Sequence, residues 1–438
     1  MKKILILAYD FPPSISVGGY RPYSWFEYFN KYGIHPVIIT RQWQNHYGDK
    51  RDYISKSNFS FDITDETELG TIIRSPYKPN LSNKLLLKYG DSRLRILRKC
   101  ITAFYEVFQH YFKIGPKVNL YFSAKKYLMN NKVDYIIATG DPFILFNYAS
   151  CLSKKFSTPW YADYRDDWIQ NHFSNINNSK LKHVITKLNR FNERRYLKNV
   201  VGFTSVSEYL VLQISKRTLI NINEVIENGA DLKYYNTNNE NPFPSNDFNI
   251  VYTGFLYDLN YLDDFWLAFE EFLRLNKFDH KIKLYFIGLN SEKNLAINSV
   301  RRYKKKYKDH IITLSRKSTS EIASYQLNAN ILLNLIAGDP EKGLIGAKSY
   351  NYAVTKNPIL TIPNVKNKKS VFFPGRDIHY VAVNSIEICE FLTKHYSYFK
   401  NGEKWRSSIT KNEIFMLSRE YNAEKLVNFI QRPNGNIQ

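Results

Sequence analysis

The sequence is poor in cysteine and lacks long apolar runs. Its 438 residues include only Cys100, Cys151 and Cys389, which are far apart in the chain and do not have the spacing of a metal site. No stretch approaches the roughly 18 uncharged apolar residues that a spanning helix needs. We therefore expect a cytoplasmic protein, from a reducing compartment, without a membrane-spanning segment.

Glycine and proline are also too scarce for a disordered or low-complexity chain, at 18 and 16 residues. The N-terminus, MKKILILAYDFPPS, has two lysines before an apolar run, as a signal peptide does. That run is about six residues long, shorter than a secretory core of roughly 7 to 15, and no small-residue cleavage site follows it. The run is therefore predicted to be a buried first strand.

Acidic residues are outnumbered. The chain has 62 Lys and Arg against 40 Asp and Glu, a net charge of +22. This charge favours an anionic partner, which would be nucleic acid, anionic lipid or a phosphorylated substrate, unless it is only a solvated surface. No helix-turn-helix or RNA-binding signature accompanies it, so nucleic acid ranks last.

Short apolar runs alternate with longer helical patterns, and the alternation occurs twice. Expected strands cover residues 4–8, 36–40, 71–73, 135–138, 160–163, 203–206, 225–227, 249–253, 284–287, 311–314, 331–335, 358–362 and 380–383. Apolar strands separated by helices imply parallel sheets covered on both faces. The predicted fold class is α/β, with two doubly wound, Rossmann-like domains.

A polar, Asn-rich segment with two prolines, residues 232–248, is the best linker in the chain. It predicts a first domain over residues 1–231 and a second over 232–415. Ligands of open parallel sheets bind beyond the carboxyl ends of the strands, so two such sheets facing one another would share a cleft. Functional residues are therefore expected on loops that follow strands.

Residues 83–130 break this alternation. They have few turn signals, many basic residues, and apolar residues at helical spacing, which predicts two or more amphipathic helices inserted into the first domain. Basic and aromatic helices of this kind suit an anionic bilayer surface. The alternative, that the apolar face packs on the domain, is favoured because every covering helix needs such a face.

Polar clusters follow three strands of the first half. Gly18 and Gly19 open a helix, whose amides and dipole could receive a phosphate, although a glycine pair is more often only a turn. Asp141 lies in a TGDP turn. The DYRDDW segment carries Asp163 and Arg165, whose carboxylate and guanidinium could orient sugar hydroxyls. Self-paired surface charges and metal binding by the aspartates are the alternatives there.

In the second half, Gly254 ends a strand where the backbone must pass close to another group. Residues 338–348, GDPEKGLIGAK, then place three glycines and two lysines before a helix at residues 349–354. A glycine loop at a helix start with lysines beside it describes a diphosphate cradle. A flexible turn with solvated lysines is the alternative, and the spacing is not that of a Walker loop.

Taken in order, these motifs resemble the retaining glycosyltransferases of family 4, which have the GT-B fold. The resemblance rests on FPPS with the double glycine, DYRDDW, FTSVSEYL, IENGAD, VYTGFLY and GLIGAKSYNYAVTKNPIL, and it spans residues 2–362. It implies a nucleotide-sugar donor bound mainly by the second domain and a glycan or lipid-linked acceptor bound mainly by the first. It also implies that no metal or other cofactor is needed, and that a last helix, at about residues 416–438, packs back on the first domain. We expect such an enzyme to take part in the assembly of a cell-surface polysaccharide.

The resemblance assigns roles residue by residue. The donor would be bound by Gly18, Gly19, Gly254, Tyr257, Glu341, Gly343, Leu344, Ile345, Gly346, Ala347, Lys348 and Asn351. The acceptor would be bound by Arg21, Asp141, Asp163, Arg165 and Glu208. Asp163, Arg165 and Lys348 would be catalytic.

The chain departs from the family pattern in its paired glutamates. Gly343 and Asn351 stand where the family has them, and Glu341 is displaced by two residues. An amide can hydrogen-bond a ribose diol, but without the assistance of charge. The alternative function is therefore that of a catalytically inactive GT-B protein that binds a nucleotide or a glycan, or that acts as a scaffold for a partner enzyme.

Overall fold

The computed structural model describes residues 1–14, 17–43, 51, 53–169, 179–236, 240–256, 262–289, 295–336, 346–363 and 378–432. The chain divides into two compact units. Unit 1 consists of Met1–Glu227 with Ala423–Gln438, and unit 2 of Asn228–Asn422. The boundary thus falls slightly before the one expected at residues 231 and 232. Each unit is described by itself.

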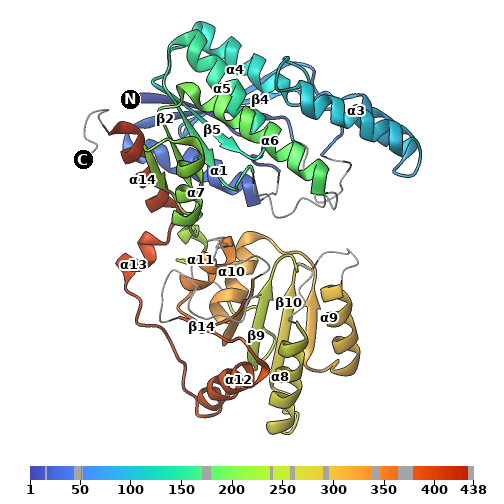
Figure 1. Cartoon of the computed structure of the whole chain (residues 1–438). Helices are drawn as coiled ribbons and strands as arrows, with labels where there is room; N and C mark the ends of the chain where they lie inside the picture. The colour runs from blue at the N-terminus through green and yellow to red at the C-terminus, as the bar shows by residue number, and fades with distance from the viewer. Residues whose placement is uncertain are drawn as a thin grey trace. The chain divides into compact units, whose positions relative to one another are not determined.

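Unit 1 is built on an eight-stranded sheet with the order β3-β4-β2-β1-β5-β6-β7-β8 (Figure 1). Its strands are β1 (Lys2–Leu7), β2 (Ile34–Arg41), β3 (Ile63–Thr67), β4 (Gly70–Ser75), β5 (Tyr135–Gly140), β6 (Trp160–Tyr164), β7 (Gly202–Ser205) and β8 (Asn223–Val225). The central strand β1 pairs in parallel with β2 and β5, with Ile4 opposite Pro36 and Tyr135. Four successive residues of β1, from Ile4 to Leu7, are fully buried, as expected for a strand covered on both faces.

The helices of unit 1 lie on both faces of this sheet. They are α1 (Val17–Tyr28), α2 (Leu81–Tyr89), α3 (Arg95–Phe108), α4 (Val118–Asn130), α5 (Ile144–Phe156), α6 (Ser179–Tyr196), α7 (Glu208–Thr218) and the end of α14 (Arg419–Gln431). Ile4 and Ile6 of β1 share one core with Trp25 of α1 and with Leu426 and Phe429 of α14. The chain therefore returns to unit 1 at its C-terminal end.

The edge strand β3 is the one strand of the described residues that the sequence pattern missed. It runs antiparallel to β4, with Thr64 opposite Ile73. Its sequence, ITDET, has no apolar run because the strand is largely solvent-exposed. Backbone pairing to β4, rather than burial of side chains, holds this strand in the sheet.

Unit 2 has a six-stranded parallel sheet with the order β11-β10-β9-β12-β13-β14. Its strands are β9 (Phe248–Thr253), β10 (Ile282–Ile287), β11 (Ile311–Leu314), β12 (Ile331–Leu335), β13 (Ile359–Ile362) and β14 (His379–Val381). Its helices are α8 (Leu262–Leu275), α9 (Leu295–Lys306), α10 (Thr319–Asn328), α11 (Ala347–Ala353), α12 (Ser385–Lys400) and α13 (Lys411–Met416). The packing of α8 and α12 on one face buries Phe265, Trp266 and Leu392. Among the described helices of the whole chain, none combines the length and apolar character needed to cross a bilayer.

Both sheets are doubly wound, as the alternation in the sequence predicted. In each, the strand order runs outward in both directions from a central pair, β1 and β5 in unit 1, and β9 and β12 in unit 2. The two loops that follow such a pair of strands run to opposite faces of the sheet, which leaves a crevice between them at the carboxyl ends of the strands. These two switch points are where a ligand is expected.

Candidate functional site

Arg165 spans the switch point of unit 1. It follows β6, and its Nε donates to the carbonyl oxygen of Gly140 at 3.0 Å, while Nη2 donates to that of Asp141. Its Nη1 lies 3.8 Å from a carboxylate oxygen of Asp10, which follows β1. One guanidinium thus connects the ends of β1, β5 and β6.

Gly18 lies directly under this guanidinium. A Cβ at position 18 would be 1.7 Å from Nη1 of Arg165 and 2.9 Å from a carboxylate oxygen of Asp10, so only glycine fits without moving the arginine. Gly19 is buried against the backbone of residues 10 and 11. The structure therefore brings together four residues that were expected on three separate segments: Gly18 and Gly19, Asp141, and Arg165. With Asp10 they form what we call the unit 1 half-site.

Asp163 and Arg21 are buried beneath the half-site. They form an ion pair of 2.7 Å with side chains 1% and 3% exposed. The carboxylate of Asp163 also accepts hydrogen bonds from Thr139 at 2.8 Å and Thr204 at 2.7 Å, and Arg21 donates to the carbonyl of Ile226 at 2.6 Å. These contacts occupy both groups and give them a positioning role, and a direct contact of either with an acceptor stays a prediction.

The rest of the DYRDDW segment is held by residues that the sequence analysis did not identify. Arg217 of α7 pairs with Asp167 at 3.1 Å and with Glu193 at 2.7 Å, and Glu193 also accepts from Tyr164. All four side chains are at most 10% exposed. Asp167 is therefore neither exposed nor paired within its own loop, contrary to the alternative of self-paired surface charges, because its partner is an arginine 50 residues away.

Glu208 lies apart from these buried networks. It is the exposed first residue of α7, which Ser207 caps by accepting from the backbone amide of Leu210. No described contact joins Glu208 to Arg165, so its role toward an acceptor stays a prediction.

The switch point of unit 2 carries Lys348, from the first turn of α11. Its Nζ donates to the hydroxyl of Tyr252 at 2.7 Å and to the carbonyl of Phe255 at 3.1 Å, and it lies 4.1 Å from the centroid of the Tyr252 ring. These partners are neutral, so they do not offset the cost of removing the ammonium from water. Burial accordingly lowers the pKa of Lys348 to about 7.

Gly254 lies beside Lys348 in the turn that follows β9. Its φ of +91° is in a region that L-residues rarely adopt, and a Cβ there would be 3.2 Å from Cε of Lys348. Its amide donates to the carbonyl of Ile287 at 2.8 Å, which ties the turn to β10. Tyr252 was not predicted as a site residue, although its position near the carboxyl end of β9 could have indicated it. Tyr252, Gly254, Phe255 and Lys348 form the unit 2 half-site.

The remaining predicted donor residues fall into two groups. Gly346 is the exposed N-cap of α11, with open space around the position of a Cβ, and Ala347 and Asn351 are partly buried in the same helix. Outside the described residues lie Tyr257, Glu341, Gly343, Leu344 and Ile345.

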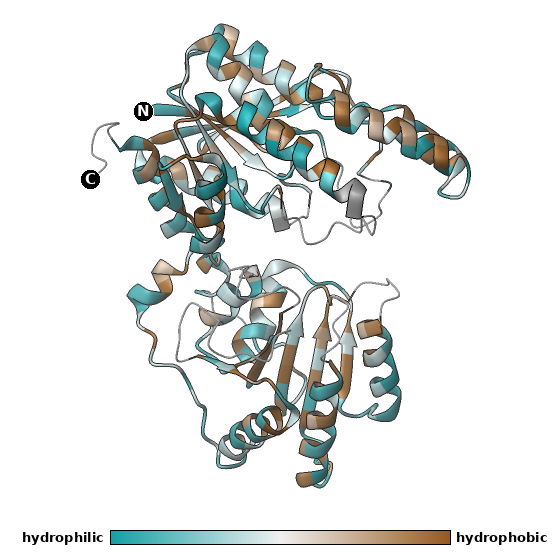
Figure 2. Cartoon of the chain, in the orientation of Figure 1, coloured by the Kyte–Doolittle hydropathy of each residue, from teal (hydrophilic) through white to brown (hydrophobic). Residues whose placement is uncertain are grey.

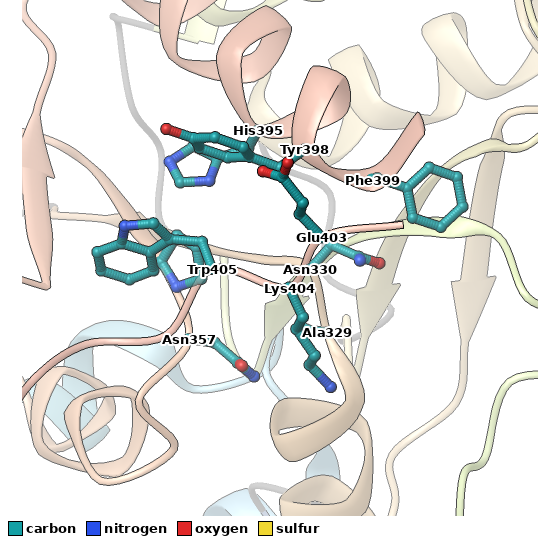
Figure 3. Close-up of a pocket in the computed structure, with 10 residues that line it drawn as sticks. Ala329, Asn330, Asn357, His395, Tyr398, Phe399, Glu403, Lys404 and Trp405 are labelled. Carbon is teal, nitrogen blue, oxygen red and sulfur yellow. The ribbon is translucent and has the colours of Figure 1, made fainter. Parts of the chain in front are cut away.

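A pocket elsewhere in unit 2 contains none of the unit 2 half-site residues (Figure 3). It lies at the opposite, amino ends of β12 and β13, where Asn330, Pro358, His395 and Trp405 line it. Its volume of about 20 Å³ is close to the space that one water molecule needs, so no nucleotide fits. Among the described residues of the whole chain, no group of three or more His, Cys, Asp or Glu could hold a metal ion.

Comparisons with known proteins agree with this arrangement of sheets. No family model matches the chain, and no curated protein matches it by sequence. Sucrose-phosphate synthase from Thermosynechococcus elongatus is similar in structure, with a TM-score of 0.60 and 12% identity over 99% of each chain.

Two further structures are similar over nearly their whole length. The catalytic domain of starch synthase IV from Arabidopsis thaliana, bound to ADP and acarbose, gives a TM-score of 0.57 at 9% identity over 99% of each chain. HepE from Anabaena, in complex with UDP and glucose, gives 0.53 at 10% identity over 99% of this chain and 100% of HepE. At such identities a likeness shows the fold alone, and this chain has the GT-B fold predicted from its sequence.

Proposed function

We propose that this chain is a glycosyltransferase that moves a sugar from a nucleotide-sugar donor to a glycan or lipid-linked acceptor. The observation that carries the proposal is the unit 2 half-site, where Lys348 and Gly254, from segments 94 residues apart, meet at the switch point of the sheet. A cation at the carboxyl edge of a doubly wound sheet suits a phosphorylated ligand. The UDP and ADP in the complexes of HepE and starch synthase IV support a nucleoside diphosphate.

In this proposal Lys348 acts on the leaving group. Transfer breaks the bond between the anomeric carbon and the diphosphate oxygen, and it forms a bond from that carbon to an acceptor oxygen, which loses its proton. Negative charge grows on the diphosphate as the first bond breaks. An ammonium held in place by Tyr252 and Phe255 offsets that charge without having to reorganise.

Within the unit 1 half-site, Asp141 and Arg165 are proposed to bind the acceptor, and a donor contact of Gly18 and Gly19 stays a prediction. The guanidinium of Arg165 places N–H groups beside the exposed Asp141. The buried ion pair of Arg21 and Asp163 holds the ends of the strands beneath these two residues. We further propose, from the resemblance of the sequence motifs, that the chain belongs to family 4, needs no metal and retains the anomeric configuration. We also propose that it takes part in the assembly of a cell-surface polysaccharide. The three free thiols support the cytoplasm as its location.

The experiment is a two-step assay on the full chain. Thermal shift with UDP, ADP and GDP identifies the nucleotide, because a ligand that binds only the folded state raises the melting temperature. Release of that nucleotide from the matching sugar donors is then measured for the wild type and for Arg165→Ala. Stabilisation together with Arg165-dependent release supports a transferase, whereas stabilisation with no release from any donor would favour an inactive nucleotide-binding protein.

A further inference from the structure

The helical insertion of unit 1 carries an apolar surface that the unit does not cover. Residues 81–112, which we call the α2–α3 arm, comprise α2, α3 and the turn after them, and α3 has no buried residue. In Figure 1, α3 extends beyond the sheet of unit 1, and Figure 2 shows hydrophobic residues along it. By contrast, α4 of the same insertion buries Leu120, Ala124 and Leu128. The expected packing on the domain therefore holds for α4 and not for α3.

The exposed residues of α3 form one continuous stripe. Ile96 is 79% exposed and Phe104 is 51% exposed. Phe104, Phe108 and Phe112 follow at intervals of four residues, and their ring centroids are 4.5 and 6.1 Å apart. Residues spaced by four lie on one face of a helix, so the stripe presents aromatic rings side by side.

The opposite face of α3 packs on α2. Ser82 of α2 donates to the carbonyl of Arg98 at 3.1 Å and shares a hydrogen bond of 2.8 Å with Thr102. The base of the arm is fixed by the buried His110, whose ring is hydrogen-bonded to the Tyr196 hydroxyl at 2.5 Å and whose backbone carbonyl accepts from Arg195 at 2.7 Å. The stripe therefore points away from α2 on an arm that is anchored in unit 1.

Basic residues surround the stripe. The arm has six Lys and Arg against two Asp and Glu, a net charge of +4, and exposed members are Lys84, Lys88, Arg93, Arg95 and Lys99. A second copy of this chain would bring the same positive arm, on a chain of net charge +22, against the first. Like charges oppose that contact, whereas anionic lipid headgroups attract the basic residues while the acyl region takes up the apolar stripe.

We infer that the α2–α3 arm docks on an anionic lipid bilayer, with the stripe of Ile96, Leu97, Phe104, Val107 and Phe108 inserted at the boundary of headgroups and acyl chains. This inference goes beyond the proposed function and does not depend on it, because it concerns a surface that carries none of the half-site residues. Each exposed large apolar side chain adds to binding through the area that it removes from water.

Vesicle flotation of the full chain tests this inference. Vesicles are of phosphatidylcholine, with or without phosphatidylglycerol, and the arm variant is Ile96→Ser with Phe104→Ser. Neither side chain is buried, so the melting temperature should not change. The matched control is Leu267→Ser with Leu275→Ser, which removes two leucines of α8 that are 57% and 53% exposed. We expect the wild type and the control to float with anionic vesicles, and the arm variant to bind at least about tenfold more weakly.

A second variant tests the charge. Arg95→Gln with Lys99→Gln should weaken binding to anionic vesicles and make it less sensitive to salt. Equal binding to both kinds of vesicle, no flotation of the wild type, or equal flotation of the arm variant would each overturn the inference. So would a dimer of the wild type, seen by light scattering, that the arm variant dissociates while neither protein binds lipid.

Discussion

Removal of the Lys348 ammonium should weaken diphosphate binding by a predictable amount. A hydrogen bond between charged groups is worth about 1.5–3 kcal/mol, so Lys348→Ala should raise the Kd of the preferred nucleoside diphosphate by about 10- to 150-fold. The control is Lys305→Ala, on the exposed surface of α9 in the same unit, which should leave the Kd unchanged. Both are measured by titration calorimetry at pH 7.5.

The pH dependence of binding gives the sharper test. Because burial lowers the pKa of Lys348 to about 7 in the free protein, most of the lysine is neutral above that pH. A bound diphosphate favours the charged form, so binding must take up a proton. If the pKa of Lys348 in the complex is about 10, the affinity falls by about 20-fold between pH 7.5 and pH 9, a range in which the phosphates themselves no longer titrate.

The same titration distinguishes the lysine from other causes. Lys348→Ala should show a nearly flat affinity over this pH range, and its binding should take up fewer protons when buffers of different ionisation enthalpy are compared. A wild-type affinity that does not change with pH, or a loss of less than about threefold in the alanine variant, would refute the placement of the phosphate beside Lys348.

Three further predictions concern stability and the unit 1 half-site. Arg217→Met leaves the buried carboxylates of Asp167 and Glu193 without their arginine and should lower the free energy of unfolding by about 3–5 kcal/mol, as measured by urea unfolding. The control, Arg274→Met, breaks an exposed ion pair with Glu271 and should lower it by less than about 1 kcal/mol. Gly18→Ala should displace Arg165 and lower donor turnover by about 10- to 100-fold with little change in melting temperature; unchanged turnover would contradict the half-site. Since the folded-state pKa of Lys348 is lowered, its unfavourable contribution to stability grows as pH falls from about 10 to about 7. Lys348→Met should therefore raise the melting temperature at pH 7 and lose that advantage by pH 10, and an equal advantage at both pH values would count against the desolvation of this partly buried ammonium.

The doubly wound sheets could be predicted from sequence because their strands are buried on both faces. Each such strand, for example β1 or β9, is a short apolar run that ends at a polar loop. The edge strand β3 has no such run and was missed. The periodicity of apolar residues indicates which side chains are buried, so a strand that is held mainly by backbone hydrogen bonds is hard to recognise in the sequence.

The half-sites were only partly predictable. Gly18, Arg165, Gly254 and Lys348 stood out because they follow strands, and the structure places them at the two switch points. The sequence could not separate exposed groups from buried ones within DYRDDW. Asp163 lies within β6 and its side chain is 1% exposed, whereas Arg165 comes just after the last residue of β6 and is 12% exposed, so the exact end of the strand decides the difference.

The partners of these residues were hidden for a different reason. Arg217 and Tyr252 are remote in sequence from Asp167 and Lys348, and only the fold brings them together. Long-range pairs of this kind carry no local pattern. The helical insertion shows a different limit of the sequence. Its apolar residues clearly predicted amphipathic helices, but their spacing did not show whether the apolar face of α3 packs on the domain or stays exposed to solvent.

Hydrogen exchange of the full chain, with and without its preferred nucleoside diphosphate, would show directly whether the diphosphate binds beside Lys348. We expect saturable protection of residues 252–256 and 346–351, around Tyr252, Gly254 and Lys348, and no such protection in Lys348→Ala at the same nucleotide concentration. Protection confined to the pocket lined by His395 and Trp405, or no protection with any nucleoside diphosphate, would contradict it.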